Sequence, residues 1–271
     1  MTKKQKIRGT FCGKFVKEVD DIRELYDEGY YNGDVYPKYT MESEKRINER
    51  RITLVNQFWK GPAKILDVGC AKGFFLSYAK KAGMEPYGAD ISNYAIHQAR
   101  KLLGESVVCC NVEEHIPFDD EFFDIITCWD SLEHLRGPSV VLKNLSRKLK
   151  KDGLIFVETC NYDSISRKLM KGNWVYYAEG YHQTPEITIK ILKNWFQSAS
   201  LTIVEAFTDY IHVPLSDQLI RVLHTPSTVV ERCFYPVRLS EYVIGEVLKN
   251  MNPNLGDLLY CIGKKNADVL S

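Results

Sequence analysis

The stretch Lys64–Leu76, KILDVGCAKGFFL, decides the fold that we predict for this chain of 271 residues. An apolar run ends at Asp67, a glycine turn follows, and an apolar segment of helical character begins at Phe74. We expect a buried strand whose carboxyl end enters a tight loop, where the backbone can approach a ligand closely. Gly69 and Gly73 allow positive φ angles and leave no side chain between that backbone and the ligand.

The spacing of these residues separates two kinds of nucleotide-binding loop. Dinucleotide-binding folds carry G-x-G-x-x-G, but here Ala71 and Phe74 stand where its second and third glycines are needed. The spacing D-x-G-x-x-x-G therefore disfavours a nicotinamide-dependent oxidoreductase. The loop is a single motif, however, and many α/β proteins turn from strand to helix in this way.

Short apolar runs alternate with helical segments from Lys64 onward. We expect strands at ILDV, PYGAD, VVCCNV, FDIITCW, LIFVET, LTIVEAF and LLYCIGKK, and helices over about 74–82, 93–103, 140–149 and 185–200. Strands separated by helices predict an α/β fold with a doubly wound, mostly parallel seven-stranded sheet and helices on both faces. Such sheets bind ligands at the carboxyl ends of their strands.

Two segments lie outside this alternation. Residues 1–59 comprise a tail that is basic over residues 3–8, the tyrosine-rich span Tyr26–Tyr39 and a helix, and they precede a domain that we place at 60–271. The tyrosine-rich span is either a lid or an N-terminal segment that its aromatic side chains pack in place. A late helical insertion is expected over about 212–252, before the last strand.

Composition narrows the class of protein. The net charge of +1 argues against a general electrostatic footprint for nucleic acid. No uninterrupted apolar stretch approaches the roughly 20 residues of a membrane-spanning helix. The eight cysteines are scattered and include no C-x-x-C pair. We therefore expect reduced core thiols in a cytoplasmic protein, and neither a zinc site nor a disulfide framework.

Further motifs follow the glycine loop in order. Asp90 ends the second predicted strand, 23 residues after Asp67, and VVCCNVEEHIPFDDEFFD, CWDSLEHLRGP and LKKDGLIFVETCN come next. In this order, over roughly residues 60–207, the motifs resemble those of the class I S-adenosylmethionine-dependent methyltransferases. Two positions depart from the family pattern: Ala71 replaces a glycine that is usual in the first motif, and Asn111 stands where an aspartate is more usual.

The resemblance implies that S-adenosylmethionine is the cofactor and that the first motif holds it. Asp90 would take both hydroxyls of the ribose, as an acid does at this point in dinucleotide folds. Asn111 would meet the adenine amino group through its amide oxygen. The cofactor-binding residues expected in this way are Asp67, Gly69, Cys70, Ala71, Gly73, Asp90, Ile91, Asn111, Val112 and Trp129, together with Tyr31 and Tyr39 of the tyrosine-rich span.

Segments outside the core resemble the ubiquinone-pathway O-methyltransferases. YYNGDVYPKY, a helix with Arg46, Arg50 and Arg51, and SRKLMKGNW have counterparts in that branch. One departure is Glu179, which occupies the position of a histidine that is frequent there, while His182 is out of register. The branch implies methyl transfer to an oxygen of a small molecule such as a sugar, glycolipid, quinone precursor or secondary metabolite. A regulatory or scaffold protein that binds the cofactor without catalysis is the alternative.

A hydroxyl acceptor calls for a base, because an alcohol is a poor nucleophile until its proton leaves. His134 directly follows a predicted strand and is the leading candidate; a histidine that only bonds backbone groups at a helix start is the alternative. Asp130, Glu133 and His134 form D-x-x-E-H, similar to the Glu-x-x-Glu-His of the ubiquinone branch, which is associated with a divalent cation. These side chains would hold magnesium or a similar ion, unless Glu133 merely caps a helix. We expect a small-molecule partner, no nucleic acid and no membrane span; a homodimer is compatible with the sequence.

Overall fold

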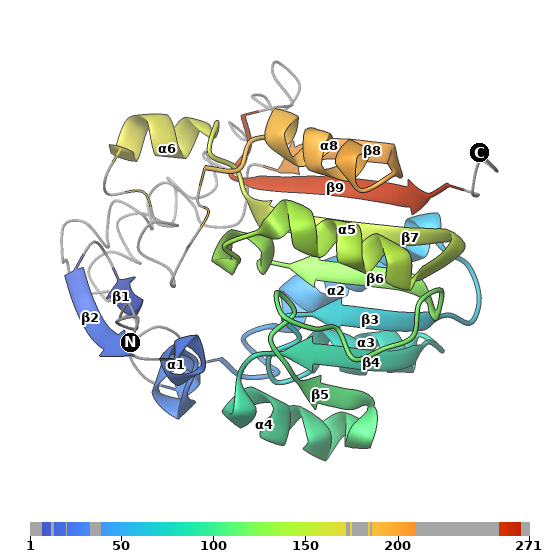
Figure 1. Cartoon of the computed structure of the whole chain (residues 1–271), viewed down its shortest axis with the longest axis horizontal. Coiled ribbons are helices and arrows are strands. Elements are labelled where there is room, and N and C mark those ends of the chain that lie inside the picture. Colours follow the sequence, from blue (N-terminus) through green and yellow to red (C-terminus); the bar gives the residue numbers. More distant parts are fainter. Residues whose placement is uncertain are drawn as a thin grey trace, which may run out of the picture.

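The centre of the fold is a sheet of seven strands in the order β5-β4-β3-β6-β7-β9-β8 (Figure 1). The computed structural model describes residues 7–11, 14–19, 21–32, 39–171, 174, 184, 186–209 and 255–266. The strands are β3 (Lys64–Val68), β4 (Glu85–Asp90), β5 (Val107–Cys109), β6 (Phe123–Trp129), β7 (Leu149–Cys160), β8 (Leu201–Asp209) and β9 (Leu258–Lys265). In this sheet β9 runs antiparallel to its neighbours β7 and β8, whereas the other pairs are parallel. The predicted mostly parallel, doubly wound sheet is confirmed.

Helices connect the strands, and side chains at their first turns determine where two of them begin. Ser92 accepts a hydrogen bond from the Ala95 N–H ahead of α4, and Thr188 accepts one from the Ile191 N–H ahead of α8. The sequence predicted that this helix begins at Pro185. The cap at Thr188 explains why α8 begins at Ile189 instead. The helices are α1 (Glu28–Asn32), α2 (Lys45–Phe58), α3 (Phe74–Lys81), α4 (Asn93–Leu103), α5 (Pro138–Lys148), α6 (Ile165–Met170) and α8 (Ile189–Ser198), with 3₁₀ turns at Ile22–Leu25, Gly104–Ser106 and Leu132–His134.

The hydrophobic core forms two layers, because alternate side chains along a strand point to opposite faces of the sheet. In β3, Leu66 and Val68 belong to the layer that also contains apolar side chains of α5 and α8. Ile65 belongs to the other layer, with side chains of α2, α3 and α4. Helices therefore bury both faces of the sheet, as the continuous apolar runs of the predicted strands require.

Two segments differ from the sequence prediction. β7 begins at Leu149, whereas the predicted strand LIFVET begins at Leu154. The added residues contain an irregularity in which Asp152 has a φ of 65°. The sequence predicted a tail that is basic over residues 3–8, but residues 7 and 8 belong to β1 (Ile7–Phe11), which pairs antiparallel with β2 (Lys14–Val19). The two strands are short runs with β-forming residues on either side of a Cys-Gly pair.

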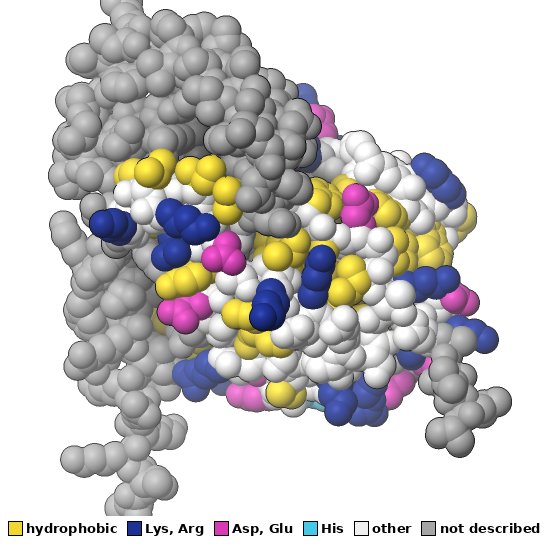
Figure 2. Space-filling model, turned by 90° about the horizontal axis from the view of Figure 1, so that it is seen from above, with side chains coloured by type: hydrophobic (Ala, Val, Ile, Leu, Met, Phe, Trp, Pro, Cys, Tyr) yellow, Lys and Arg dark blue, Asp and Glu magenta, His cyan; other side chains and the backbone are white. Residues whose placement is uncertain are grey.

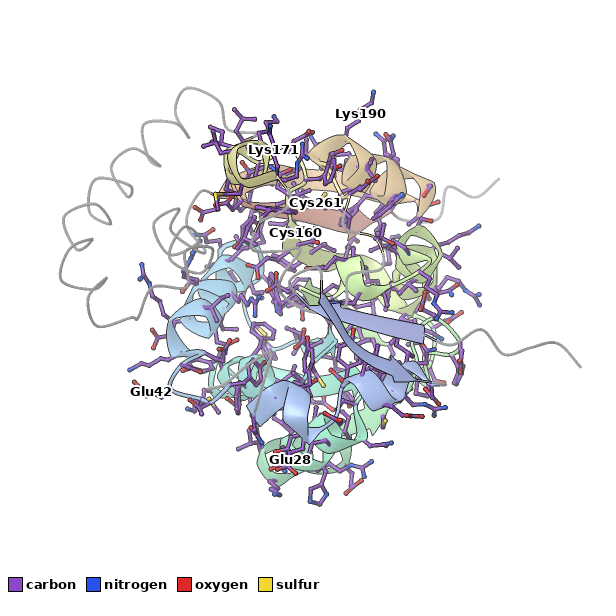
Figure 3. All side chains as sticks on the ribbon, turned by 90° about the vertical axis from the view of Figure 1, so that its left-hand side faces the viewer. Glu28, Glu42, Cys160, Lys171, Lys190 and Cys261 are labelled. Carbon is purple, nitrogen blue, oxygen red and sulfur yellow. The ribbon has the colours of Figure 1, made fainter. Side chains whose placement is uncertain are left out.

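The elements β1, β2 and α1 lie together at one end of the sheet strands, on the left of Figure 1. Figure 3 views the molecule from that side, with α1, where Glu28 is labelled, lying near α4. Seen from above, basic and acidic side chains are interspersed over the described part of the surface (Figure 2). No described helix is both long and apolar enough to cross a membrane.

The described cysteines fit the sequence prediction of core thiols. Cys70, Cys128, Cys160 and Cys261 are buried free thiols, and Cys109 and Cys110 are partly buried free thiols. The predicted helical insertion at about 212–252, and with it Glu179 and His182, lies outside the described residues.

Candidate cofactor and acceptor site

A cavity of about 460 Å³ lies at the carboxyl ends of β3, β4 and β6, within the range of roughly 300–1,000 Å³ that small-molecule sites occupy. Its walls combine the loops after these strands with side chains from the N-terminal segment and α2. All but three of the predicted cofactor-binding residues line it: Gly69, Ala71, Asp90, Ile91, Asn111, Val112, Trp129, Tyr31 and Tyr39. The candidate catalytic residues Asp130, Glu133 and His134 line the same cavity.

The glycine loop presents bare backbone to this cavity. Gly69 has a φ of 76°, and a Cβ placed on it would lie 2.3 Å from Oγ of Ser131, which excludes any larger residue. Ala71 also adopts a positive φ, 47°, which costs an L-residue roughly 1–2 kcal/mol. Its N–H donates to Oδ2 of Asp90 at 2.8 Å. Ala71 thus takes the backbone conformation that the glycine usual at this position would adopt freely.

Backbone N–H groups of Ala71, Ile91 and Ser92 hold Asp90 at the end of β4. Its Oδ2 accepts from Ala71, and its Oδ1 accepts from the Ser92 N–H at 2.8 Å. Asp90 is 7% exposed, and burial raises its pKa although the three N–H groups favour the charged form. An ionised carboxylate has about four lone-pair sites, so Asp90 keeps acceptor capacity for a ligand on its cavity side.

The three predicted residues that do not line the cavity support its wall. Gly73 has a φ of 76° before α3, and a Cβ on it would lie 2.8 Å from Cδ1 of Leu103, so this glycine serves the packing of α3 against α4. Cys70 is buried beside Gly88 of β4. Asp67 accepts a hydrogen bond from Oγ1 of Thr127 at 2.7 Å, and burial raises the pKa of Asp67 to about 7.

The side chain of Asn111 is less available to the adenine amino group than predicted. Its Oδ1 accepts from the Glu113 N–H at 3.1 Å, and its Nδ2 donates to Oε1 of Glu114 at 3.1 Å. The amide therefore stabilises its own turn. Val112, buried beside it, also lines the cavity.

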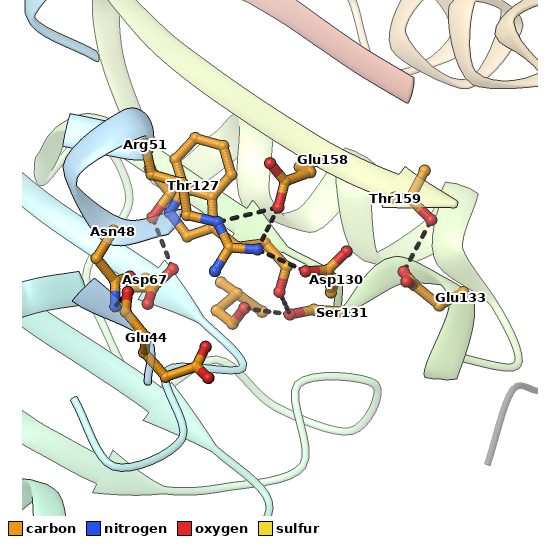
Figure 4. Close-up of polar contacts among 12 residues, drawn as sticks. Glu44, Asn48, Arg51, Asp67, Thr127, Asp130, Ser131, Glu133, Glu158 and Thr159 are labelled. Atoms are coloured by element: carbon orange, nitrogen blue, oxygen red, sulfur yellow. Dashed lines mark hydrogen bonds and ion pairs between the residues drawn. The ribbon is translucent and has the colours of Figure 1, made fainter. Parts of the chain in front are cut away.

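Arg51 of α2 lies at the other end of the cavity and was not distinguished by sequence from the other arginines of its helix. Its Nε donates to Oε1 of Glu158 at 2.9 Å, and its Nη2 forms ion pairs with both Glu158 and Asp130. The guanidinium also lies 5.3 Å from the ring centre of Trp129. Trp129 is 5% exposed, and its indole N–H has no hydrogen-bond acceptor among the described residues. Figure 4 shows Arg51 between Glu158 and Asp130.

The predicted metal site is not supported, because its side chains are directed to different partners. Asp130 pairs with Arg51, while Glu133 accepts a hydrogen bond from Oγ1 of Thr159 at 2.8 Å (Figure 4). Within the described ranges no group of three or more His, Cys, Asp or Glu side chains is placed to hold a metal ion. Burial raises the pKa of Glu133 to about 7. This carboxyl therefore changes protonation near neutral pH.

His134 lies where the sequence predicted a base, at the end of the 3₁₀ turn after β6 and at the cavity wall. It is half-buried, and its ring meets that of Tyr26 edge-on with 6.2 Å between the ring centres. Tyr26 belongs to the N-terminal segment, so this segment reaches across the cavity to the loop after β6. The role of His134 as a base stays a prediction.

Comparison with known proteins identifies the family. The methyltransferase domain family matches residues 43–206, more than half of the chain. The chain belongs to this family. Among curated relatives of this methyltransferase, the ubiquinone biosynthesis O-methyltransferase of Actinobacillus pleuropneumoniae serotype 7 is 31% identical over 126 residues, covering 42% of this chain and 54% of the relative. The ubiquinone biosynthesis O-methyltransferase of Hydrogenovibrio crunogenus is 33% identical over 122 residues, covering 43% and 51%. The chain thus spans about half the length of the curated relatives it matches.

Solved structures agree with the fold of this methyltransferase. A SAM-dependent methyltransferase from Archaeoglobus fulgidus has a TM-score of 0.58 and 21% identity, with 90% of this chain and 100% of that chain covered. At that identity the likeness shows the fold alone. With the family match, it confirms the resemblance to class I S-adenosylmethionine-dependent methyltransferases that the order of the motifs predicted.

Proposed function

We propose that this protein transfers the methyl group of S-adenosylmethionine to a hydroxyl oxygen of a small-molecule acceptor. The observation that carries the proposal is a single cavity whose wall includes Ala71 and Asp90 as well as Glu133 and His134. A cofactor and an acceptor can therefore meet in one cavity. The two ubiquinone biosynthesis O-methyltransferases among the relatives support oxygen as the acceptor atom.

The residues of the cavity fit this cofactor. Asp90 is oriented by backbone N–H groups and retains acceptor capacity for a ribose hydroxyl. The backbone of Gly69 lines the cavity, and its missing Cβ makes room for Ser131, which lines the same cavity. Trp129 holds a buried indole N–H without an acceptor among the residues described, and an acceptor atom of a ligand would satisfy it. When bound, S-adenosylmethionine supplies a methyl group on a sulfonium, which is already electrophilic.

The chain then has two tasks, which are to align the acceptor oxygen and to remove its proton. Alignment alone contributes about 7–11 kcal/mol in well-oriented systems. His134 would take the proton as general base, because a neutral imidazole accepts protons near neutral pH and this ring lies at the cavity wall. The side chains of Tyr26, Tyr30 and Tyr31 narrow the same space from the N-terminal segment, which supports the lid role predicted for that segment; its residues 33–38 lie outside the described ranges.

Two measurements test this function. Isothermal titration should show saturable binding of S-adenosylmethionine and none of NAD. Transfer of radiolabelled methyl groups to a panel of phenols, catechols and sugars should show turnover that a chelator leaves unchanged. His134→Ala should lower that turnover by roughly 10²–10⁴-fold with cofactor affinity preserved. Binding without transfer to any acceptor would favour the non-catalytic alternative, and the absence of binding would refute the proposal.

A further inference from the structure

Lys72, the residue after Ala71 in the glycine loop, is buried among groups of the N-terminal segment. The side chain is 8% exposed. Its Nζ donates to Oδ1 of Asn32 at 2.8 Å and to the backbone carbonyl of Tyr39 at 3.1 Å. A buried ammonium needs such partners, since an isolated charge is costly to remove from water. Burial lowers the pKa of Lys72 below its usual value.

Three tyrosine rings surround the same ammonium. Nζ of Lys72 lies 5.7 Å from the ring centres of Tyr31, Tyr39 and Tyr94, within the roughly 6 Å over which a cation is attracted to an aromatic face. Tyr31 and Tyr39 line the cavity, whereas Tyr94 belongs to α4. The lysine therefore joins three parts of the chain, which are the glycine loop, the N-terminal segment and α4.

Residues that neighbour Lys72 or hold the N-terminal segment also donate hydrogen bonds to Asp90. The amide of Asn32 also donates to the hydroxyl of Tyr94 at 2.6 Å, so Asn32 is held on two sides. Ser92 donates from Oγ to the backbone carbonyl of Tyr26 at 2.5 Å, while its N–H donates to Asp90. A second backbone donor to Asp90 is Ala71, the neighbour of Lys72. Each backbone group that orients Asp90 is thus adjacent to a side chain that holds the N-terminal segment.

We propose that Lys72 is a positioning residue for the cofactor. It fastens residues 21–32 and Tyr39 to the glycine loop, so that Tyr31 and Tyr39 close the cavity beside the loop and Asp90. Lys72 acts through these tyrosines and does not itself line the cavity. The inference rests on the proposed function, because it assumes that the cavity binds S-adenosylmethionine. It adds a residue that no family motif singles out and a physical reason for the tyrosine-rich composition of this segment.

The experiment compares Lys72→Met, which keeps the length of the side chain and removes its charge, with Lys72→Arg, which keeps the charge. Lys81→Met is the matched control, because the ammonium of Lys81 lies 5.4 Å from the ring of Tyr78 on the exposed side of α3. Lys72→Met should raise both the Kd and the KM for S-adenosylmethionine by about tenfold while kcat changes by less than about threefold. Lys72→Arg should restore most of the affinity, and Lys81→Met should match the wild type.

Hydrogen exchange on the cofactor-free proteins tests the contact independently of cofactor binding. Residues 21–32 should exchange faster in Lys72→Met than in the wild type, whereas α5 should not change. Asn32→Ala, at an exposed position, provides a second variant that removes one acceptor and should give a smaller change of the same kind. Unchanged exchange over 21–32, or Lys72→Arg no better than Lys72→Met, overturns the inference. Failure of the wild type to bind S-adenosylmethionine, with exchange as expected, would refute the proposed function and leave the fastening role standing.

Discussion

Replacing Arg51 by methionine should destabilise the protein more than any other single charge removal on α2. The side chain of Glu158 is 1% exposed and that of Arg51 is 11% exposed, so the variant leaves a buried carboxylate without its cation. Removing one partner of a buried ion pair costs about 3–5 kcal/mol. For a chain of this size that corresponds to a fall in Tm of roughly 6–20 °C. Urea unfolding followed by circular dichroism measures the free energy directly.

Arg50 supplies the matched control for this prediction. Arg50 lies on the same helix as Arg51 and pairs with Asp209 of β8. The side chain of Arg50 is 42% exposed and that of Asp209 is 16% exposed, so Arg50→Met should cost no more than about 1 kcal/mol. In Arg51→Met the pKa of Glu158 should rise above its unfolded value, and the deficit should therefore grow as the pH rises from 5 to 8. Adding Glu158→Gln should recover about 2–3 kcal/mol. A cost below about 1 kcal/mol for Arg51→Met, or no recovery in the double variant, would refute the reasoning.

Asp90→Ala removes a carboxylate whose charged hydrogen bonds are worth about 1.5–3 kcal/mol. Isothermal titration should therefore show an affinity for S-adenosylmethionine that is at least about tenfold weaker. An unchanged titration curve would refute the assignment of Asp90 to the ribose. Ala71→Gly relieves the φ of 47° and should stabilise the protein by about 0.5–1 kcal/mol after the entropic cost of glycine, and a lower Tm would contradict this. Burial raises the pKa of Asp67, Glu133 and Asp257 to about 7, above the roughly 4 of the unfolded chain. The unfolded state therefore loses these protons first, and stability should fall as the pH rises from about 4 to 7. The drop in urea midpoint between pH 5.5 and 8 should be smaller in Glu133→Gln; equal drops would exclude Glu133 as a contributor.

The sheet and the glycine loop of the site could be predicted from sequence, because the backbone geometry at the end of a strand restricts which residue types are allowed there. A strand that ends in a turn with positive φ requires glycine or a strained substitute, and Gly69 and Ala71 fill those roles. The same signal also misleads. Gly73 was predicted to admit a ligand, whereas its missing Cβ admits Ala99 and Leu103 of α4. Ligand approach and helix packing select the same residue, so sequence alone does not separate them.

Arg51 and Lys72 could not be predicted as site residues, because their roles depend on partners far along the chain. Arg51 bonds Glu158 across 107 residues, and Lys72 bonds Asn32 across 40. Neither distance leaves a periodicity in the sequence. The arginine-rich helix was visible, but which of its arginines faces the sheet depends on how α2 packs. For Lys72, the one available signal was the number of tyrosines in the preceding segment, which predicts aromatic packing and does not name the cation.

The motif D-x-x-E-H shows why residue types in a short pattern do not define a metal site. Asp130 and Glu158 lie close together at the ends of β6 and β7, and two such carboxylates cannot both stay ionised without a nearby positive charge. Arg51 supplies that charge from α2. Glu133 turns instead to Thr159 of β7 and is left with a pKa of about 7. A divalent cation placed beside Asp130 would have to displace or repel the guanidinium. The positive charge that the motif calls for is therefore provided by a residue 79 positions away, outside the span that the motif covers.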